Sequence, residues 1–328
     1  MSVLVSILVP IYKVEKYIKE CAISLFEQTY KNIEFIFVND CTPDDSINIL
    51  QQIIEEYPDR KRFVRIINHE KNRGLSAARN TAVEAATGEF IMHVDSDDSI
   101  DLDTVSRCVD ELIKNNADVI VFSFKNVFPN KSSIEHNVIP EDITEYVNKI
   151  IRRECVVCVC GGLYRRSLYM NYGIRAIEGL NMGEDYVTKP RLLYNAQKAI
   201  YIDEPFYHYR HTNEESYTKN FKEKHIIDLS LSLSVLHDYF KNVPNSVDYR
   251  DTLRVGTLKT KAILWIDWAL SGGNKKLIDK IRNLYSEYTS LEGLRAQDKC
   301  VLWFADHGFY NLLYLFAYIG LKLKYFLK

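Results

Sequence analysis

The 328-residue sequence lacks an excess of charge of either sign, since 42 Lys and Arg residues stand against 44 Asp and Glu residues and the net charge is −2. This balance does not predict a broad cationic surface, so we expect no nucleic-acid partner. No basic segment precedes the first apolar run, and the sequence therefore lacks a recognisable signal peptide. These features favour a reducing, cytoplasmic location.

The seven cysteines lack the spacing of a zinc finger. Cys155, Cys158 and Cys160 lie close together but have no second group at a suitable distance along the chain. They stand in the apolar stretch ECVVCVCGG, so we interpret them as small buried hydrophobic residues. A metal site is the less favoured alternative.

The sequence also lacks an apolar run that clearly predicts a membrane span. Phe309–Leu321 is apolar and aromatic, but it is short and is interrupted or flanked by Asp306, His307 and Asn311. Three lysines follow in the terminal KLKYFLK. Two interpretations stay open: an amphipathic helix that lies on a membrane surface, and a helix that packs in the core.

Short apolar runs alternate with amphipathic segments over the first 128 residues. This rhythm predicts an α/β fold with a doubly wound, mostly parallel sheet. The predicted strands are Val3–Val9, Ile33–Val38, Phe63–Ile67, Phe90–Val94 and Asp118–Phe124, and the predicted helices include Tyr17–Phe26, a segment that begins after Thr42–Asp45, Gly74–Thr87 and Leu102–Ile113.

The rhythm changes after Phe128. We expect a surface loop at Pro129–His136, a helix at Ile143–Ile151, a cysteine-rich strand, and then short strands with a helix that begins near Gly183. From about Phe221 the pattern is helical. We therefore predict a domain at 1–220, divided at about residue 128 into two halves, and a helical carboxyl-terminal region at 221–328.

Polar residues stand at the ends of three predicted strands. Pro10 and Tyr12 end the first, Asp40 follows the second, and the acidic DSDD begins at Asp95 after the fourth. The carboxyl ends of parallel strands meet at one edge of a sheet, so these residues predict a shared crevice. There the ring can stack on a base, Asp40 can accept a hydrogen bond from a base N–H, and the acids can hold a divalent cation on a diphosphate. An acidic turn that only begins the next helix is the alternative.

The first strand end has no G-x-G-x-x-G, the fingerprint of dinucleotide binding. The strand ends instead stand in VSILVPIYKVEKYIKECAISLFEQTYKNIEFIFVNDCTPDDS and in NRGLSAARNTAVEAATGEFIMHVDSDD. Over about Ser2–Ser216 the sequence resembles family 2 glycosyltransferases of the GT-A fold, of the bacterial polysaccharide and capsule type. The resemblance implies an inverting enzyme that takes a sugar from a nucleotide diphosphate, with a donor half at about 1–128 and an acceptor half at about 129–220. DCTPDDS replaces the common DGSTDDS but keeps Asp40.

The resemblance assigns the nucleoside to one set of residues. Pro10, Tyr12 and Asp40 would hold uracil, while Asn68 and Arg79 would line the base and the ribose. For Arg79 a salt bridge that fixes its helix to the acidic loop is an alternative or additional role.

The resemblance assigns the diphosphate and the cation to the acidic loop. Asp95 would contact the ribose or the sugar, and Asp97 and Asp95 would bind Mn²⁺ or Mg²⁺. Ser96, between them, would also contact the nucleotide sugar. Asp98 would orient its neighbours.

In the second half, NMGEDY resembles the family segment that supplies the general base. The resemblance makes Asp185 this base and Glu184 its supporting residue. An inverting transfer needs one carboxylate to take the proton of the acceptor hydroxyl. Acidic residues also occur at helix N-termini for stability alone, which is the alternative for this pair.

YHYRHTNEESYT, Tyr207–Thr218, is similar to the family's Y-R…S segment. Arg210 and Ser216 would then approach the diphosphate, and the loop would close over the donor. His208 and His211 flank Arg210 as weaker candidates.

GGLYRR, which begins at Gly161, resembles an acceptor-side strand, with Leu163 where the family often has Lys. None of the three tryptophans stands in the Q-x-x-R-W segment of processive synthases. The resemblance thus favours addition of a single sugar.

We therefore expect a metal-dependent transferase that moves a hexose or N-acetylhexosamine from a UDP-sugar to a glycan acceptor. A lipid-linked acceptor would place the protein at the inner face of the cell membrane, in contact through its carboxyl-terminal helix. The alternatives are a non-catalytic subunit that binds nucleotide sugars and a nucleotidyltransferase. The latter usually has a basic, glycine-rich first loop, which Val9–Lys13 does not provide.

Overall fold

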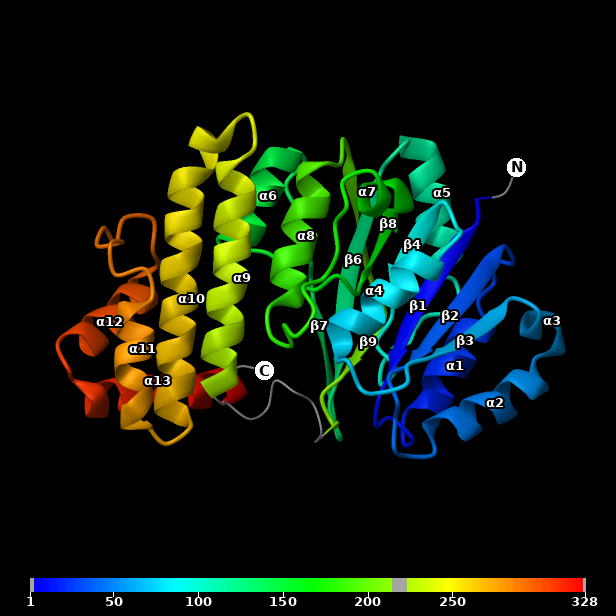
Figure 1. Ribbon diagram of the computed structural model, residues 1–328, viewed down its shortest axis with the longest axis horizontal. Coiled ribbons are helices and arrows are strands. Elements are labelled where there is room, and N and C mark those ends of the chain that lie inside the picture. Colours follow the sequence, from blue (N-terminus) through cyan, green and yellow to red (C-terminus); the bar gives the residue numbers. More distant parts are fainter. Residues whose placement is uncertain (1–2, 214–222, 327–328) are drawn as a thin grey trace. The chain divides into compact units, whose positions relative to one another are not determined.

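The computed structural model describes residues 3–213 and 223–326, which form two compact units (Figure 1). Among the described residues, the first unit comprises 3–147 and 155–213, and the second comprises 148–154 and 223–326. The predicted division of the first domain into a donor half and an acceptor half stays a prediction.

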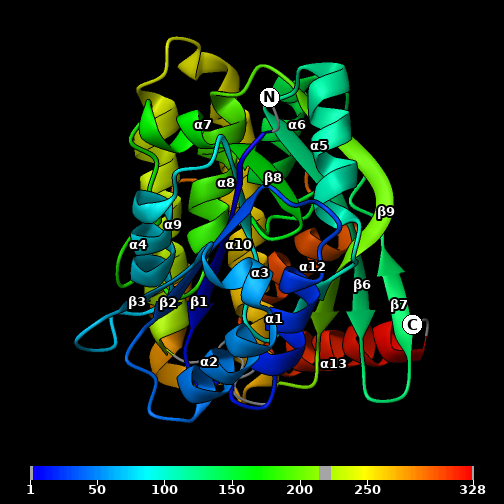
Figure 2. The same ribbon diagram turned by 90° about the vertical axis from the view of Figure 1, so that its right-hand side faces the viewer.

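Within the described residues of the first unit, nine strands form one sheet in the order β3-β2-β1-β4-β8-β6-β9-β5, and β7 pairs with β6 (Figure 2). The pairs β1–β2, β2–β3, β1–β4 and β6–β9 are parallel, whereas β8, β5 and β7 run antiparallel to their neighbours. The prediction of a mostly parallel α/β sheet is confirmed. The strands are β1 (Val5–Ile11), β2 (Ile33–Asn39), β3 (Val64–Asn68), β4 (Phe90–His93), β5 (Ser99–Ile100), β6 (Val119–Val127), β7 (Ser132–Glu135), β8 (Gly162–Arg165) and β9 (Ala199–Arg210).

The helices of this unit pack on the sheet through their apolar stripes. Buried residues of α1, α2 and α5 form one core with β1, β2 and β6, while α4 lies against β1 and β2. The helices are α1 (Ile18–Phe26), α2 (Ser46–Glu56), α3 (Pro58–Lys61), α4 (Leu75–Ala85), α5 (Thr104–Asn115), α6 (Ile143–Ile151, which crosses the boundary between the units), α7 (Arg166–Met170) and α8 (Glu184–Tyr194).

Two predictions about local structure are wrong. The expected loop at Pro129–His136 contains the strand β7, because its backbone pairs with β6 although its side chains are mostly exposed. The expected cysteine-rich strand does not form, and β8 begins only at Gly162. The preceding segment instead has carbonyl groups bound by a buried lysine, Lys189, which donates to the carbonyls of Val156 and Cys158. The backbone carbonyls of a buried apolar segment can thus be bound by a side chain, so the segment need not pair with a neighbouring strand.

The second unit is helical, as predicted for the carboxyl-terminal region. Helix α10 contacts α9, α11, α12 and α13, and Trp265 on α10 is fully buried. Across residues 3–213 and 223–326, no helix has the length and apolar character that crossing a membrane would require. The elements are α9 (Glu223–Lys241), η2 (Ser246–Tyr249), α10 (Arg250–Leu270), η3 (Lys275–Leu277), α11 (Ile278–Asn283), α12 (Ala296–Asp306) and α13 (Tyr310–Phe326).

Arg60 on α3 holds the chain that connects α1 to β2. Its buried guanidinium donates to the carbonyls of Phe26 at 3.0 Å, Tyr30 at 3.0 Å and Lys31 at 3.1 Å, and also to that of Gln28. The last carbonyls of a helix have no partner within the helix, so a side chain that binds them stabilises its end. Burial lowers the pKa of Arg60, and these carbonyls offset part of the cost of its charge.

Replacing Arg60 by Met should lower the free energy of unfolding by about 2–4 kcal/mol, because several buried carbonyls lose their donor. Lys61→Met is the matched control. Its ammonium pairs with Glu55 at the surface, where such a pair is worth at most about 1 kcal/mol. Urea unfolding of both variants measures the difference, and equal stabilities would contradict this role of Arg60.

Candidate active site

The strand order places the predicted polar residues at one edge of the sheet. β2, β1 and β4 are neighbours, with Ile11 opposite Asn39 and Asn39 opposite Asn68 of β3. Tyr12, just beyond β1, is 41% exposed, whereas Pro10 within β1 is buried. Asn68 is exposed and accepts a hydrogen bond from the Asn39 side chain at 2.8 Å. The exposed ring of Tyr12 is therefore accessible for stacking.

Asp40 fixes the loop between β3 and α4. Its buried carboxylate accepts hydrogen bonds from the backbone N–H groups of Arg73 at 2.8 Å and Gly74 at 2.7 Å, and it contacts Nδ1 of His69 at 2.7 Å. Gly74 precedes α4 with a φ of 88°, a conformation that favours glycine. Asp40 thus determines where α4 begins. Sequence reasoning missed His69, although it directly follows the end of β3, where the rule applied to the other strands would have found it.

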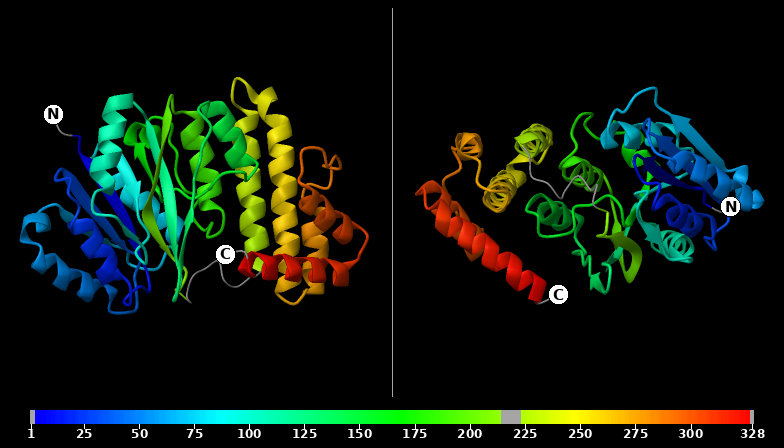
Figure 3. Two further views of the ribbon diagram at one scale, coloured as in Figure 1. Left: turned by 180° about the vertical axis from the view of Figure 1, so that it is seen from behind. Right: turned by 90° about the horizontal axis from the view of Figure 1, so that it is seen from below.

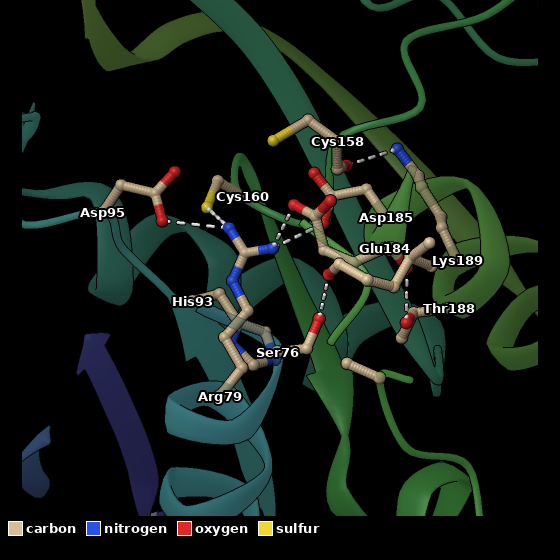
Figure 4. A network of polar contacts seen from close by, with 12 residues as sticks. Ser76, Arg79, His93, Asp95, Cys158, Cys160, Glu184, Asp185, Thr188 and Lys189 are labelled. Carbon is tan, nitrogen blue, oxygen red and sulfur yellow. Dashed lines mark hydrogen bonds and ion pairs between the residues drawn. The ribbon is translucent and has the colours of Figure 1, made fainter. Parts of the chain in front are cut away.

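The guanidinium of Arg79 joins elements that are far apart in the sequence (Figure 4). One nitrogen donates to Asp185 at 2.8 Å and to Glu184 at 3.1 Å, and another donates to Asp95 at 2.9 Å. The Arg79 side chain is only 5% exposed. Four of the residues singled out from the sequence therefore meet in one network, and the salt bridge considered for Arg79 is present.

The network shifts the pKa values of its members. Burial alone would lower the pKa of Arg79, but the charges of Asp185 and Asp95 raise it above the ordinary value, so the guanidinium stays protonated. Burial raises the pKa of Asp185, whereas Arg79 acts to lower it. Burial, followed by repulsion from Asp185, raises the pKa of Glu184 to about 8. The two neighbouring carboxyl groups therefore do not behave like exposed acids.

Two thiols and a lysine surround the acidic pair. Cys160 lies 3.8 Å from a guanidinium nitrogen of Arg79, and a hydrogen bond with Cys158 acts to lower the pKa of Asp185. Lys189 lies four residues after Asp185 on α8, and its ammonium donates to the Val156 carbonyl at 2.8 Å and the Cys158 carbonyl at 3.0 Å. Sequence reasoning interpreted these cysteines as small buried hydrophobic residues, with a metal site as the less favoured alternative, and did not identify Lys189.

Residues at the end of β9 and just beyond it hold the acidic loop after β4. Arg210 donates its backbone N–H to Asp98 at 2.8 Å and its Nε to the Asp97 carbonyl at 3.0 Å. Asn213 donates to the Asp97 carboxylate at 2.7 Å, and the Tyr207 hydroxyl accepts the Asp95 N–H at 3.0 Å. The loop is therefore fixed by a strand more than 100 residues further along the chain.

Three of the remaining candidates near β9 contact other side chains of the protein. Arg210 also forms an ion pair with Glu20 on α1, which the sequence did not indicate. His208 pairs with Asp101 at 3.0 Å, and His211 contacts the Asn126 side chain at 2.8 Å, so the structure gives both histidines protein partners. Ser216 lies outside the described residues.

The acidic loop has the chemistry of a cation site. Burial, followed by repulsion from neighbouring acids, raises the pKa values of Asp97 and Asp98. A bound cation would relieve this repulsion, and carboxylate oxygens suit Mg²⁺ and Mn²⁺. In the described part of the chain no three His, Cys, Asp or Glu side chains are grouped so that they could hold a metal ion. A cation there would need further ligands, such as phosphate oxygens.

Comparisons with known proteins agree with this architecture. The family model described as Glycosyl transferase family 2 matches residues 6–173. EpsJ of Bacillus subtilis, named as an uncharacterized glycosyltransferase, is 34% identical over 217 residues, which cover 64% of this chain and 62% of EpsJ. The poly(ribitol-phosphate) beta-N-acetylglucosaminyltransferase TarS of Staphylococcus aureus is 30% identical over 207 residues, 62% of this chain and 35% of TarS. The chain thus spans less than two thirds of the length of both relatives.

Two solved structures are similar to this one. The structure of S. aureus TarS 1–349 in complex with UDP-GlcNAc has a TM-score of 0.70 at 22% identity, and the alignment covers 97% of this chain and 92% of the TarS chain. The mannosyltransferase PcManGT from Pyrobaculum calidifontis, in complex with GDP-Man and Mn²⁺, has a TM-score of 0.55 at 14% identity, with 97% and 85% covered. At these identities the likeness shows the fold alone, and this fold is the expected one.

Replacing Asp98 by Asn should raise the melting temperature of the metal-free protein at pH 7 by a few degrees. An acid whose pKa is raised on folding destabilises the folded state once the pH exceeds its pKa in the unfolded chain, and Asn, which does not ionise, removes that penalty. Mn²⁺ should then stabilise the variant less than it stabilises the original protein. Asp110→Asn, at an exposed position of α5, should leave both quantities unchanged. A lower melting temperature for metal-free Asp98→Asn would contradict the prediction.

Proposed function

Because the chain belongs to glycosyl transferase family 2, whose model it matches over residues 6–173, we propose that it transfers a sugar from a UDP-sugar to a glycan acceptor with inversion at the anomeric carbon. The main support is the hydrogen-bond network of Arg79, whose guanidinium binds both Asp185 and Asp95, a residue of the predicted cation site. The GT-A fold is common to transferases that use different sugars, so the site and not the fold must define the chemistry.

The donor would lie along the ends of β1, β2 and β3. The exposed Tyr12 would stack on uracil beside Pro10 and Asp40, and Asn68 would face the ribose. Asp40 already accepts three protein contacts, so its role includes holding the Gly74 turn against the nucleotide. The complex of TarS with UDP-GlcNAc supports a UDP-sugar, with a hexose or an N-acetylhexosamine as the transferred group.

Asp185 would act as the general base. Its carboxylate would take the proton from the acceptor hydroxyl while the oxygen forms a bond to the anomeric carbon and the bond to the UDP oxygen breaks. Arg79 would favour the ionised form of Asp185 by its charge and would orient the carboxylate. Glu184, held by the same guanidinium, would support this geometry.

Asp97 and Asp95 would hold a divalent cation, and Ser96 forms the turn between them. Such a cation neutralises charge on the departing diphosphate. Mn²⁺ in the complex of PcManGT supports this choice. Arg210 lies against the Asp97 carbonyl and would add a positive charge near the phosphates. The proposal also assigns Ser216, which lies outside the described residues, to the diphosphate.

The acceptor would be a glycan, with a lipid-linked chain as the proposed form. The name of TarS, a poly(ribitol-phosphate) beta-N-acetylglucosaminyltransferase, supports a polymeric acceptor. A lipid-linked acceptor is held at a membrane, so we place the protein in the cytoplasm at the inner face of the cell membrane. Helix α13 would provide a peripheral contact there.

Replacing Asp185 by Asn should reduce UDP release with acceptor at least about 100-fold, because the attacking hydroxyl loses its base. Stabilisation by UDP and Mn²⁺ should persist, since the carboxylate is not part of the predicted nucleotide site. A panel of UDP-sugars, screened first for thermal stabilisation, identifies the donor to use. Glu178→Gln, at an exposed carboxylate that pairs with Arg73, is the control and should retain turnover. Full activity of Asp185→Asn, or the absence of turnover in both proteins, would contradict the proposal.

Replacing Arg79 by Gln should move the acidic limb of the pH profile of kcat/KM to higher pH. The guanidinium acts to lower the pKa of Asp185, so its loss raises that pKa, and the base is then protonated at pH values where it is now ionised. Arg73→Gln removes an exposed guanidinium from the same region and should leave the limb in place. A limb that stays fixed in Arg79→Gln would show that Asp185 is not the titrating base.

A further inference from the structure

Helix α13, drawn in red in Figure 3, has several apolar residues that are exposed. Leu312, Leu315 and Ile319 are 48%, 51% and 48% exposed, and their spacing of three and four residues places them along one side. Tyr314 and Tyr318 continue this side, with ring centroids 6.1 Å apart. We call these five residues the α13 face.

The α13 face is not needed for the core of its unit. The helix contacts α10 and α12, and its buried residues include Leu313 and Ala317, which lie one turn apart. The five residues of the α13 face point away from this stripe. A helix on the surface of a globular unit normally has polar residues there, so the core of the unit does not account for these exposed apolar and aromatic side chains.

Two aromatic residues extend the apolar surface beyond α13. Trp303 on α12 is 47% exposed and Phe309 before α13 is 45% exposed, and their ring centroids are 5.5 Å apart. Trp and Tyr are the residues that occur most often at the boundary between a bilayer and water, because each combines an apolar ring with a polar group. The composition therefore suits a lipid headgroup region.

The charges of α13 favour one class of partner. Residues 310–326 include no Asp or Glu, while Lys322 and Lys324 occur near the end of the helix. The Lys322 ammonium lies 5.6 Å from the Tyr318 ring centroid, beside the α13 face. Lysine is depleted in protein–protein interfaces but is attracted to anionic phospholipids. An anionic bilayer therefore fits this surface better than a second protein does.

We propose that the α13 face, with Trp303 and Phe309, docks on the surface of an anionic lipid bilayer, with the helix lying in the plane of the headgroups. This inference specifies the peripheral membrane contact of the proposed function. The docking itself does not depend on that function, but its purpose does, since docking would bring the site to a lipid-linked acceptor. The apolar side chains would provide most of the affinity, and the lysines would select anionic lipid.

Flotation of the full chain with vesicles tests the docking without donor or acceptor. The protein should float with vesicles of phosphatidylcholine and phosphatidylglycerol, float less at high salt, and stay behind with phosphatidylcholine alone. Trp265 and Trp268 are buried, so a blue shift of tryptophan emission on binding should come from Trp303 and should vanish in Trp303→Phe.

Variants of the α13 face should separate the apolar and charged contributions. The double substitution Leu315→Ser with Ile319→Ser should weaken binding at least about tenfold, and Lys322→Gln about fivefold. The matched control is Ile227→Ser with Leu231→Ser, which changes two exposed apolar residues one turn apart on α9, 55% and 41% exposed. This control should bind vesicles as the original protein does.

Three results would overturn the docking: no flotation of the original protein with anionic vesicles, equal flotation of the Leu315/Ile319 double variant, or a dimer in gel filtration that this variant splits into monomers. The last would show that the α13 face joins two copies of the chain. Turnover of UDP-sugar without vesicles should be unchanged in the double variant. A protein that floats but never releases UDP would instead contradict the proposed transfer and leave the docking intact.

Discussion

The buried guanidinium of Arg79 is the constraint on which the arrangement of the site depends. A buried cation is stable only when anions surround it, and Arg79 finds Asp95 from the end of β4 and the acidic pair at the start of α8. Its own helix is positioned by Asp40, which binds the turn before α4. Asp40, α4, Arg79 and Asp185 thus form a continuous series of contacts from the proposed nucleotide site to the proposed general base.

The acidic loop shows the cost of building such a site. Asp97 and Asp98 are crowded and partly or fully buried, which raises their pKa values and destabilises their ionised forms. The backbone N–H of Arg210 and the side chain of Asn213 offset part of this cost. The loop therefore gathers carboxyl groups whose repulsion a cation would relieve, and that cation would in turn hold a diphosphate.

The two units depart from an ordinary globular protein in different ways. The first unit buries charges in pairs, whereas α13 in the second unit exposes apolar residues that its own core does not use. Both departures from an ordinary globular protein lie where we propose function: proton transfer and donor binding in one unit, and contact with lipid in the other. Local sequence rules fail most often at such positions.

The sequence by itself determined the local elements of the sheet and the polar residues at its edge. Apolar runs predicted β1, β2, β3, β4 and β6, and the residues that follow them predicted the positions of Tyr12, Asp40 and Asp95, because burial period and strand ends are local properties. Only the tertiary structure decided which distant groups meet. Arg79 binds Glu184, which lies 105 residues further along the chain. Lys189 binds a carbonyl of the segment where we expected a cysteine-rich strand, and β7 forms because its backbone pairs with β6. No local pattern in the sequence reveals these pairings, because they depend on which surfaces come together when the whole chain packs.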